Sequence, residues 1–101
     1  MKRVSETALE KVAFSVTVKF KLAAIAWENG SNSGNPATLE RENRSCMRWR
    51  EQAEKQLEPF GITVDYPGLY PTFRLNYGGI VREYRDVRQA LAVANGDKES
   101  V

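Results

Sequence analysis

The sequence predicts an α+β fold in which two N-terminal helices precede a small three-stranded antiparallel sheet and a short C-terminal helix. Three observations support this order. A long amphipathic pattern follows the Asn-Pro pair at 35–36, residues 72–84 alternate around a Gly-Gly pair, and the apolar segment 87–94 ends at Asn-Gly. A chain of 101 residues suffices for one core. We therefore place a single compact domain at 1–95 and a disordered tail at 96–101.

The first element carries two competing patterns. Strict alternation of apolar and polar residues in SVTVKFKL (15–22) is typical of a strand. Over the wider window 7–28, apolar residues recur at helical spacing, Thr7 and Glu10 can form a capping box, and the Asn-Gly pair at 29–30 supplies a stop. A strand of that length would be unusual, so we favour a helix and keep a strand as the alternative.

The second helix has clear end signals. Asn35 suits the N-cap, Pro36 the first helical position, and the helical pattern continues to about Glu58, before Pro59 and Gly61. We expect this long helix to be the backbone of the fold and to cover one face of the sheet. Its apolar residues are expected to form one buried stripe, with Met47 beside it: Leu39, Cys46, Trp49, Ala53, Leu57 and Phe60.

The three strands are predicted at residues 61–66, 72–77 and 80–84. Gly78-Gly79 joins the last two as a favoured two-residue turn. That register sets Arg74 opposite Glu83 and places Arg82 on the face that belongs to the core. Because burying a lone charge costs several kcal/mol, Arg82 must extend to solvent, form a pair or contact a partner.

The composition excludes several kinds of site. The chain contains one cysteine and no histidine, which excludes an internal disulfide, a multi-cysteine zinc site and Ser-His or Cys-His nucleophiles. No glycine motif for phosphate occurs, and nothing marks the carboxylates near the hairpin (Asp65, Glu83 and Asp86) as a catalytic pair. We expect no enzymatic activity, no metal and no cofactor. The net charge of +2 permits contact with nucleic acid without requiring it.

Two lysines argue against a membrane-spanning helix in this sequence. Lys19 and Lys21 interrupt the most apolar stretch, so neither a membrane-spanning helix nor a signal peptide is expected. Cys46 falls on the buried stripe, where it acts as a small apolar residue. We expect a soluble protein of a reducing cytoplasm.

Arginines concentrate on the second helix, where Arg41, Arg44, Arg48 and Arg50 lie within ten residues. Arginine is preferred for bidentate contacts to carboxylate or phosphate. Glutamates interleave with these arginines, however, which favours an ion-paired, solvent-exposed helix face. Binding of protein or nucleic acid is the alternative.

The segment DYPGLYPTF (65–73) contains two of the four prolines, each preceded by a tyrosine. A turn at Tyr66-Pro67-Gly68-Leu69 followed by a strand start at Pro71 explains the segment without a partner. Aromatic residues on a rigid bend are also typical of interface anchors, and an exposed Pro-Gly suits a prolyl isomerase. The isomers of the two Tyr-Pro bonds stay open, because such bonds have little trans preference.

The whole chain resembles the lambdoid-phage anti-RecBCD accessory proteins. The length, the opening MKRVSETALEKV and the DYPGLYP loop carry the resemblance. It implies a non-enzymatic phage protein that binds the RecBCD helicase-nuclease of the bacterial host cytoplasm through the RecC subunit. Such proteins modulate the enzyme, protect phage DNA ends and promote phage recombination. A host peptidyl-prolyl isomerase that engages Pro67 or Pro71 is expected as a second partner.

For such a mechanism we assign partner binding to the loop and to three arginines: Tyr66, Pro67, Gly68, Leu69, Tyr70, Pro71, Arg44, Arg48 and Arg82.

Two other classes remain open. The order of the strands and the last helix resembles double-stranded-RNA-binding domains, so a nucleic-acid-binding module with a basic face is the alternative function. The last helix departs from those domains, since it begins DVRQALAVA without their lysine-rich start. A toxin–antitoxin or assembly component would self-associate, and exposure of Trp27 or Trp49 would favour it.

Overall fold

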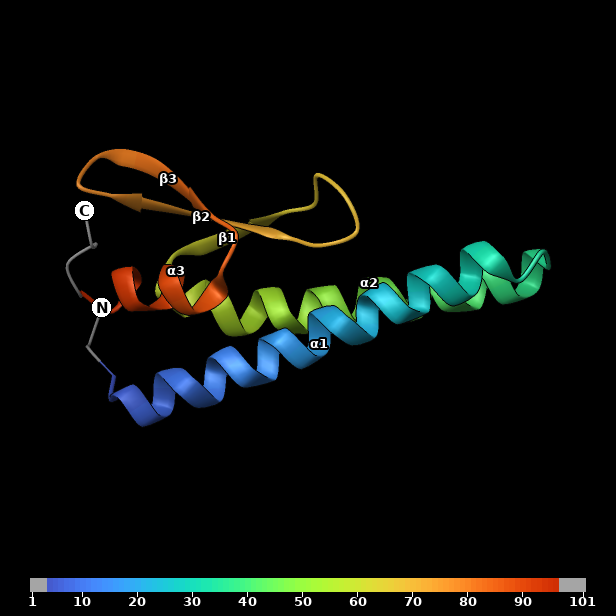
Figure 1. Cartoon of the computed structure of the whole chain (residues 1–101), viewed down its shortest axis with the longest axis horizontal. Coiled ribbons are helices and arrows are strands. Elements are labelled where there is room, and N and C mark those ends of the chain that lie inside the picture. The colour runs from blue at the N-terminus through green and yellow to red at the C-terminus, as the bar shows by residue number, and fades with distance from the viewer. Residues whose placement is uncertain (1–3, 97–101) are drawn as a thin grey trace.

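The computed structural model describes residues 4–96 and confirms the predicted α+β class. Its elements are α1 (Glu6–Asn32), α2 (Pro36–Leu57), a 3₁₀ turn (Glu58–Phe60), β1 (Ile62–Asp65), β2 (Thr72–Tyr77), β3 (Ile80–Tyr84) and α3 (Val87–Ala94). The two long helices form an antiparallel hairpin, and the sheet and α3 lie on one side of it (Figure 1). From residue 97 on, the predicted tail lies outside the described residues.

The first element is a helix throughout. Ser5 is the N-cap, and its hydroxyl accepts a hydrogen bond from the Ala8 N–H at 3.2 Å. The predicted capping box of Thr7 and Glu10 is therefore wrong, because α1 already begins at Glu6. A local capping motif can fit two neighbouring registers, and tertiary packing selects between them.

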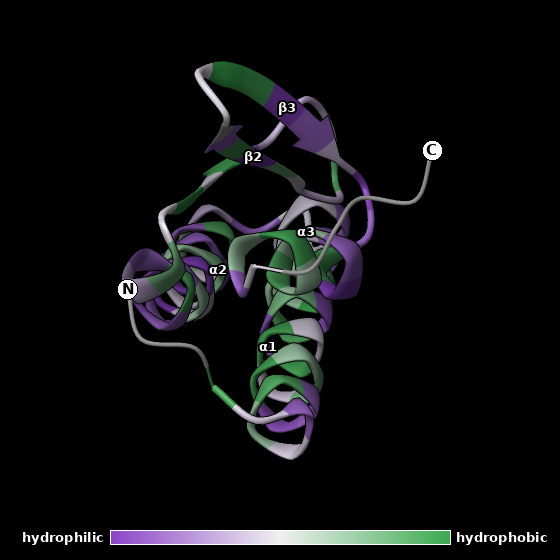
Figure 2. Ribbon diagram, turned by 90° about the vertical axis from the view of Figure 1, so that its left-hand side faces the viewer, coloured by the Kyte–Doolittle hydropathy of each residue, from purple (hydrophilic) through white to green (hydrophobic). Residues whose placement is uncertain are grey.

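Helical geometry splits the alternating segment between two faces. Val16 and Phe20 are buried in the core, whereas Phe14 is 66% exposed and Val18 is 38% exposed. A strand would have placed all four side chains on one face. The alternation therefore reflects a helix that is apolar on two sides, and α1 is predominantly green in Figure 2 while α2 shows more purple.

The predicted stop at Gly30 is also wrong, since α1 continues to Asn32. Gly30 is buried at the crossing with α2, where an added Cβ would lie 3.1 Å from the Cβ of Glu42. The glycine thus permits close helix approach. A small buried cluster lies on the side of Gly30 away from the α1–α2 turn. It consists of Ala23, Ala26 and Cys46, and Trp49 packs against it. The half of the hairpin that contains the α1–α2 turn is therefore held together mainly by small side chains.

The second helix has the predicted caps. The Asn35 side chain accepts hydrogen bonds from the N–H groups of Ala37 and Thr38, and Pro36 follows it. At 22 residues α2 is nevertheless shorter than α1, which has 27. The stripe prediction holds for Cys46, Ala53 and Leu57, which are buried. It is wrong at Leu39, which is 40% exposed because this part of α2 extends beyond the sheet (Figure 1).

The sheet has the order β1-β2-β3, and both pairs are antiparallel. Gly78 and Gly79 have φ values of 63° and 80°, the left-handed region that the tight turn needs. The predicted register is confirmed, with Arg74 opposite Glu83. On the outer face the Nε of Arg74 lies 2.7 Å from Asp65 and 3.3 Å from Glu83, so one cation links all three strands.

The inner face of the sheet rests on a core that all three helices share. Phe20 of α1 and Phe73 of β2 meet edge to face, with ring centroids 5.7 Å apart. Residues of α2 and α3 complete the same cluster, so α2 alone does not cover the sheet as expected. Asn95 ties the two ends of the described chain together. Its Oδ1 accepts a hydrogen bond from the Val4 N–H at 2.8 Å, and its Nδ2 donates one to the Val4 carbonyl at 2.9 Å.

The described chain is elongated, with extents of 48 × 26 × 19 Å. The length comes from the hairpin, since α1 alone spans about 40 Å at 1.5 Å per residue. The half of the hairpin near the α1–α2 turn extends beyond the sheet and α3 (Figure 1). None of the described helices combines the length and the apolar character that crossing a membrane requires.

Two phenylalanines of α1 test the orientation of the helix. Phe20→Ala should lower the free energy of unfolding by about 3–5 kcal/mol, because a buried aromatic ring is lost from the core. Phe14→Ala should change it by less than about 0.5 kcal/mol. Urea unfolding at low protein concentration measures both. Similar losses for the two variants would contradict the helical assignment of residues 14–20.

Candidate protein-binding site

The loop between β1 and β2, residues 66–71, is here called the proline loop. It rises over the middle of the hairpin and is drawn in yellow in Figure 1. The described chain contains no cis peptide bond, so both Tyr-Pro bonds are trans. Tyr70 is 65% exposed and Pro67 and Gly68 are exposed, while Leu69 and Pro71 are half-buried. The exposed part of the loop is therefore smaller than the predicted contact loop.

Tyr66 is half-buried and fixes the base of the proline loop. Its ring lies 6.3 Å from the ring of Phe20, centroid to centroid. The guanidinium carbon of Arg50 lies 4.1 Å from the Tyr66 ring centroid, which is a cation–π contact. The sequence treats the two Tyr-Pro pairs alike, and only the helices beneath them distinguish their roles.

The hydroxyl of Tyr66 is in an unfavourable environment for ionisation. Its oxygen is buried, with no hydrogen-bond partner in bonding geometry among the described residues. Burial first, and the negative charge of Glu54 second, raise the pKa of Tyr66 well above its ordinary range, and Arg50 partly opposes them. The folded loop base therefore favours the neutral phenol.

Tyr70 and Pro71 line a hollow of about 330 Å³ between the proline loop, α1 and the start of α3. Phe20, Phe73 and Val87, all almost fully buried, contribute to its apolar lining. Two exposed cations, Lys21 and Arg85, also line it. An apolar side chain that is followed or preceded by a carboxylate would match this arrangement.

The one carboxylate of this hollow already has a role. Asp86 is the N-cap of α3, and its side chain accepts a hydrogen bond from the Arg88 N–H at 2.9 Å. Lys21 and Arg85 therefore supply its uncommitted charge. Sequence patterns do not single them out, because Lys21 lies on α1 and Arg85 follows β3, and only the fold brings them together.

A second hollow, of about 310 Å³, lies on the other side of the proline loop. Tyr66 and Pro67 line it together with the Asp65–Arg74–Glu83 group on the outer face of the sheet. Its charges are already paired, so it has less to offer a partner than the hollow beside Tyr70.

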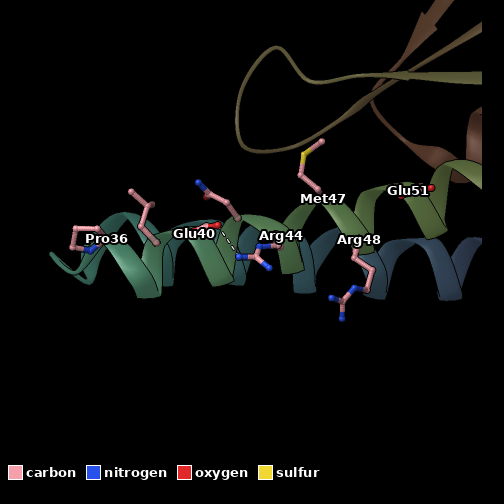
Figure 3. A pocket seen from close by; sticks show the side chains of 8 residues that line it. Pro36, Glu40, Arg44, Met47, Arg48 and Glu51 are labelled. Atoms are coloured by element: carbon pink, nitrogen blue, oxygen red, sulfur yellow. Dashed lines mark hydrogen bonds and ion pairs between the residues drawn. The ribbon is translucent and has the colours of Figure 1, made fainter.

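The predicted arginines do not join the loop in one cluster. Arg44 and Arg48 are exposed on α2, where they line a hollow of about 650 Å³ with Leu39 and Met47. In Figure 3, Met47 points to the side of the proline loop, whereas Arg48 points away from it. Arg44 lies 2.7 Å from Glu40, as expected of an ion-paired face, and such exposed pairs contribute little to stability.

Arg82 lies on β3, opposite Leu75 on the face of the sheet toward the helices, and is half-buried. This confirms the inward direction expected from the alternation. Arg82 therefore lies on the sheet and does not share a surface with Arg44 and Arg48 of α2.

Three other features were candidates for a site: the cysteine, the two tryptophans and groups of possible metal ligands. Cys46 is 1% exposed, which confirms its place in the buried stripe. Trp27 is 45% exposed and Trp49 is half-buried. Within residues 4–96, no three acidic or cysteine side chains gather closely enough to hold a metal ion.

Comparison of the chain with protein-family models, with curated proteins and with solved structures finds no match.

The state of Tyr66 predicts how stability depends on pH. Its pKa is higher in the folded chain than in the unfolded chain, so folded protein keeps the proton as pH rises above about 10. The contribution of Tyr66 to the free energy of unfolding is therefore fully present below that pH and decreases above it. The decrease is at most about 1.4 kcal/mol per pH unit, and it is smaller here because the ring is partly exposed.

Tyr66→Phe should remove this part of the alkaline loss, because the phenylalanine ring has no hydroxyl to ionise. Urea unfolding of both proteins between pH 7 and pH 11 measures the difference. Parallel profiles for the two proteins would show that the phenol of Tyr66 is not responsible.

Proposed function

We propose that this chain is a small protein-binding accessory module that docks on a larger enzyme through the proline loop. The observation that carries the proposal is the exposed ring of Tyr70 beside an apolar hollow lined by Lys21 and Arg85. Exposed aromatic residues next to pockets are typical anchors of protein interfaces. Tyr66 holds the loop base, which lowers the ordering cost of binding.

We propose the RecBCD helicase-nuclease as the partner, bound through its RecC subunit in the cytoplasm of a bacterial host. The resemblance of MKRVSETALEKV and DYPGLYP to lambdoid-phage anti-RecBCD accessory proteins supports this choice. In this role the chain acts without catalysis, modulates the enzyme, protects phage DNA ends and favours phage recombination. A net charge of +2 agrees with binding to protein, since a mimic of DNA would be strongly acidic.

A host peptidyl-prolyl isomerase is proposed as a second partner. The two prolines differ in access: Pro67 and the following Gly68 are exposed, whereas Pro71 is half-buried. Exposure therefore supports Pro67 as the residue that the isomerase engages.

Replacing Tyr70 tests the docking proposal. Tyr70→Ala should weaken the affinity for purified RecBCD at least about tenfold, because loss of an interface anchor costs about 2 kcal/mol or more and tenfold corresponds to about 1.4 kcal/mol. The matched control is Val81→Ser on β3, which removes a side chain of similar exposure away from the loop and should leave the affinity unchanged. Immobilised protein and a titration of RecBCD by biolayer interferometry give both values.

The outcomes separate the parts of the proposal. Equal affinities of wild type and Tyr70→Ala would exclude the proline loop as the contact, and absence of wild-type binding would exclude RecBCD. A titration of duplex DNA and RNA tests the alternative function. Affinity for nucleic acid that falls by orders of magnitude between 50 and 200 mM salt would favour a nucleic-acid-binding module.

A further inference from the structure

The helix α1 carries an apolar stripe on the side away from the core. Phe14, Val18 and Ile25 are 66%, 38% and 53% exposed. Their spacings of four and seven residues place them on one face of the helix. Single exposed apolar residues are ordinary, whereas an aligned set on one helix marks an interaction surface. The opposite face of α1, with Val16 and Phe20, is buried, so the stripe lies apart from the face that packs against the base of the proline loop.

The charges beside this stripe show which partner fits it. Glu10 lies one turn before Phe14 and Lys21 one turn after Val18, and both are exposed on the same flank of the helix, toward α3. The ion pairs of the described residues involve neither side chain. Lys11 is exposed on the opposite flank. On this flank Glu10 is therefore followed by Lys21 and then by Glu28, which is also exposed, and Arg88 of α3 lines the hollow beside Glu10.

We propose that α1 pairs antiparallel with α1 of a second copy of this chain. Phe14 packs against Val18 of the partner subunit, and Glu10 forms an ion pair with Lys21 of the partner subunit. In an antiparallel pair about a two-fold axis, each flank faces the same flank of the other copy. The symmetry therefore forms each contact twice, and Val16 lies at the level of the axis.

Charge excludes the competing arrangements of the same stripe. A parallel pair in register would set Glu10 level with the partner subunit's Glu10 and Lys21 level with the partner subunit's Lys21. An antiparallel pair shifted to bring Phe14 onto the partner subunit's Ile25 would bring Glu10 against the partner subunit's Glu28, which carries the same charge. Of these three arrangements, the register centred at Val16 satisfies the apolar and the charged residues together.

The contact involves one helix from each copy, which limits its strength. A surface of this kind falls below the roughly 1,200 Å² of total buried area that stable complexes reach. We therefore expect a dimer with a dissociation constant in the micromolar range. Its affinity should decrease as salt is added, because the two ion pairs are at the rim.

Charge reversal of the pair is the test. Sedimentation equilibrium of the full chain from about 1 to 200 μM should show a monomer–dimer equilibrium. Glu10→Lys and Lys21→Glu should each weaken dimerisation about tenfold or more, because each replaces two attractions by two repulsions. The double variant E10K/K21E should restore the wild-type dissociation constant. Circular dichroism checks that all variants keep their helix content.

A second pair of variants tests the apolar stripe of α1. Phe14→Ser should abolish the dimer, whereas Ile80→Ser, at a side chain of 59% exposure on β3, should leave it intact. A wild type that stays monomeric at 200 μM, a double variant that does not regain the dimer, or equal effects of the two serine variants would each overturn the proposal. Lys21 also lines the hollow beside Tyr70, so Glu10→Lys and Phe14→Ser are the variants that separate dimerisation from binding of RecBCD by the proline loop.

Discussion

The aromatic contact of Phe20 with Phe73 and Tyr66 is the interaction on which the rest of the structure depends. It joins one helix to the middle strand and to the base of the proline loop. The outer face of the sheet carries the Asp65–Arg74–Glu83 group, whereas the buried side chains Phe73, Leu75 and Tyr84 lie on its inner face. Without the ring of Phe20, the middle strand and the base of the proline loop would lose the aromatic contact that they share on α1.

Local signals in the sequence were sufficient for most of the fold. Asn35 and Pro36 start α2, and the two glycines of the hairpin set a register that the structure reproduces. The first helix was harder to predict from the sequence, because the apolar residues Phe14 and Val18 lie on its solvent side and produce a strand-like alternation together with Val16. Its true end was hidden for a related reason. Gly30 serves contact between helices, and a glycine's role in packing cannot be distinguished from a stop by sequence alone.

The candidate site was located by sequence but not resolved by it. Two identical Tyr-Pro pairs give no local reason for Tyr66 to be an anchor and Tyr70 to be exposed. The difference comes from Arg50 and Phe20, which approach the first tyrosine only in the folded chain. The cations beside Tyr70 were missed for the same reason, since Lys21 and Arg85 are neighbours only through the packing of α1 against the end of the sheet.

The small residues at the far end of the hairpin have a consequence for motion. Ala23, Ala26 and Gly30 permit close approach but bury little apolar surface, while the large side chains of the core lie at the other end. Free energies of local opening should therefore form a gradient along α1 and α2, lowest near the connecting turn. Amide hydrogens there should exchange through fraying of the helix pair, so that the tip of the hairpin adapts its shape while the aromatic core stays closed.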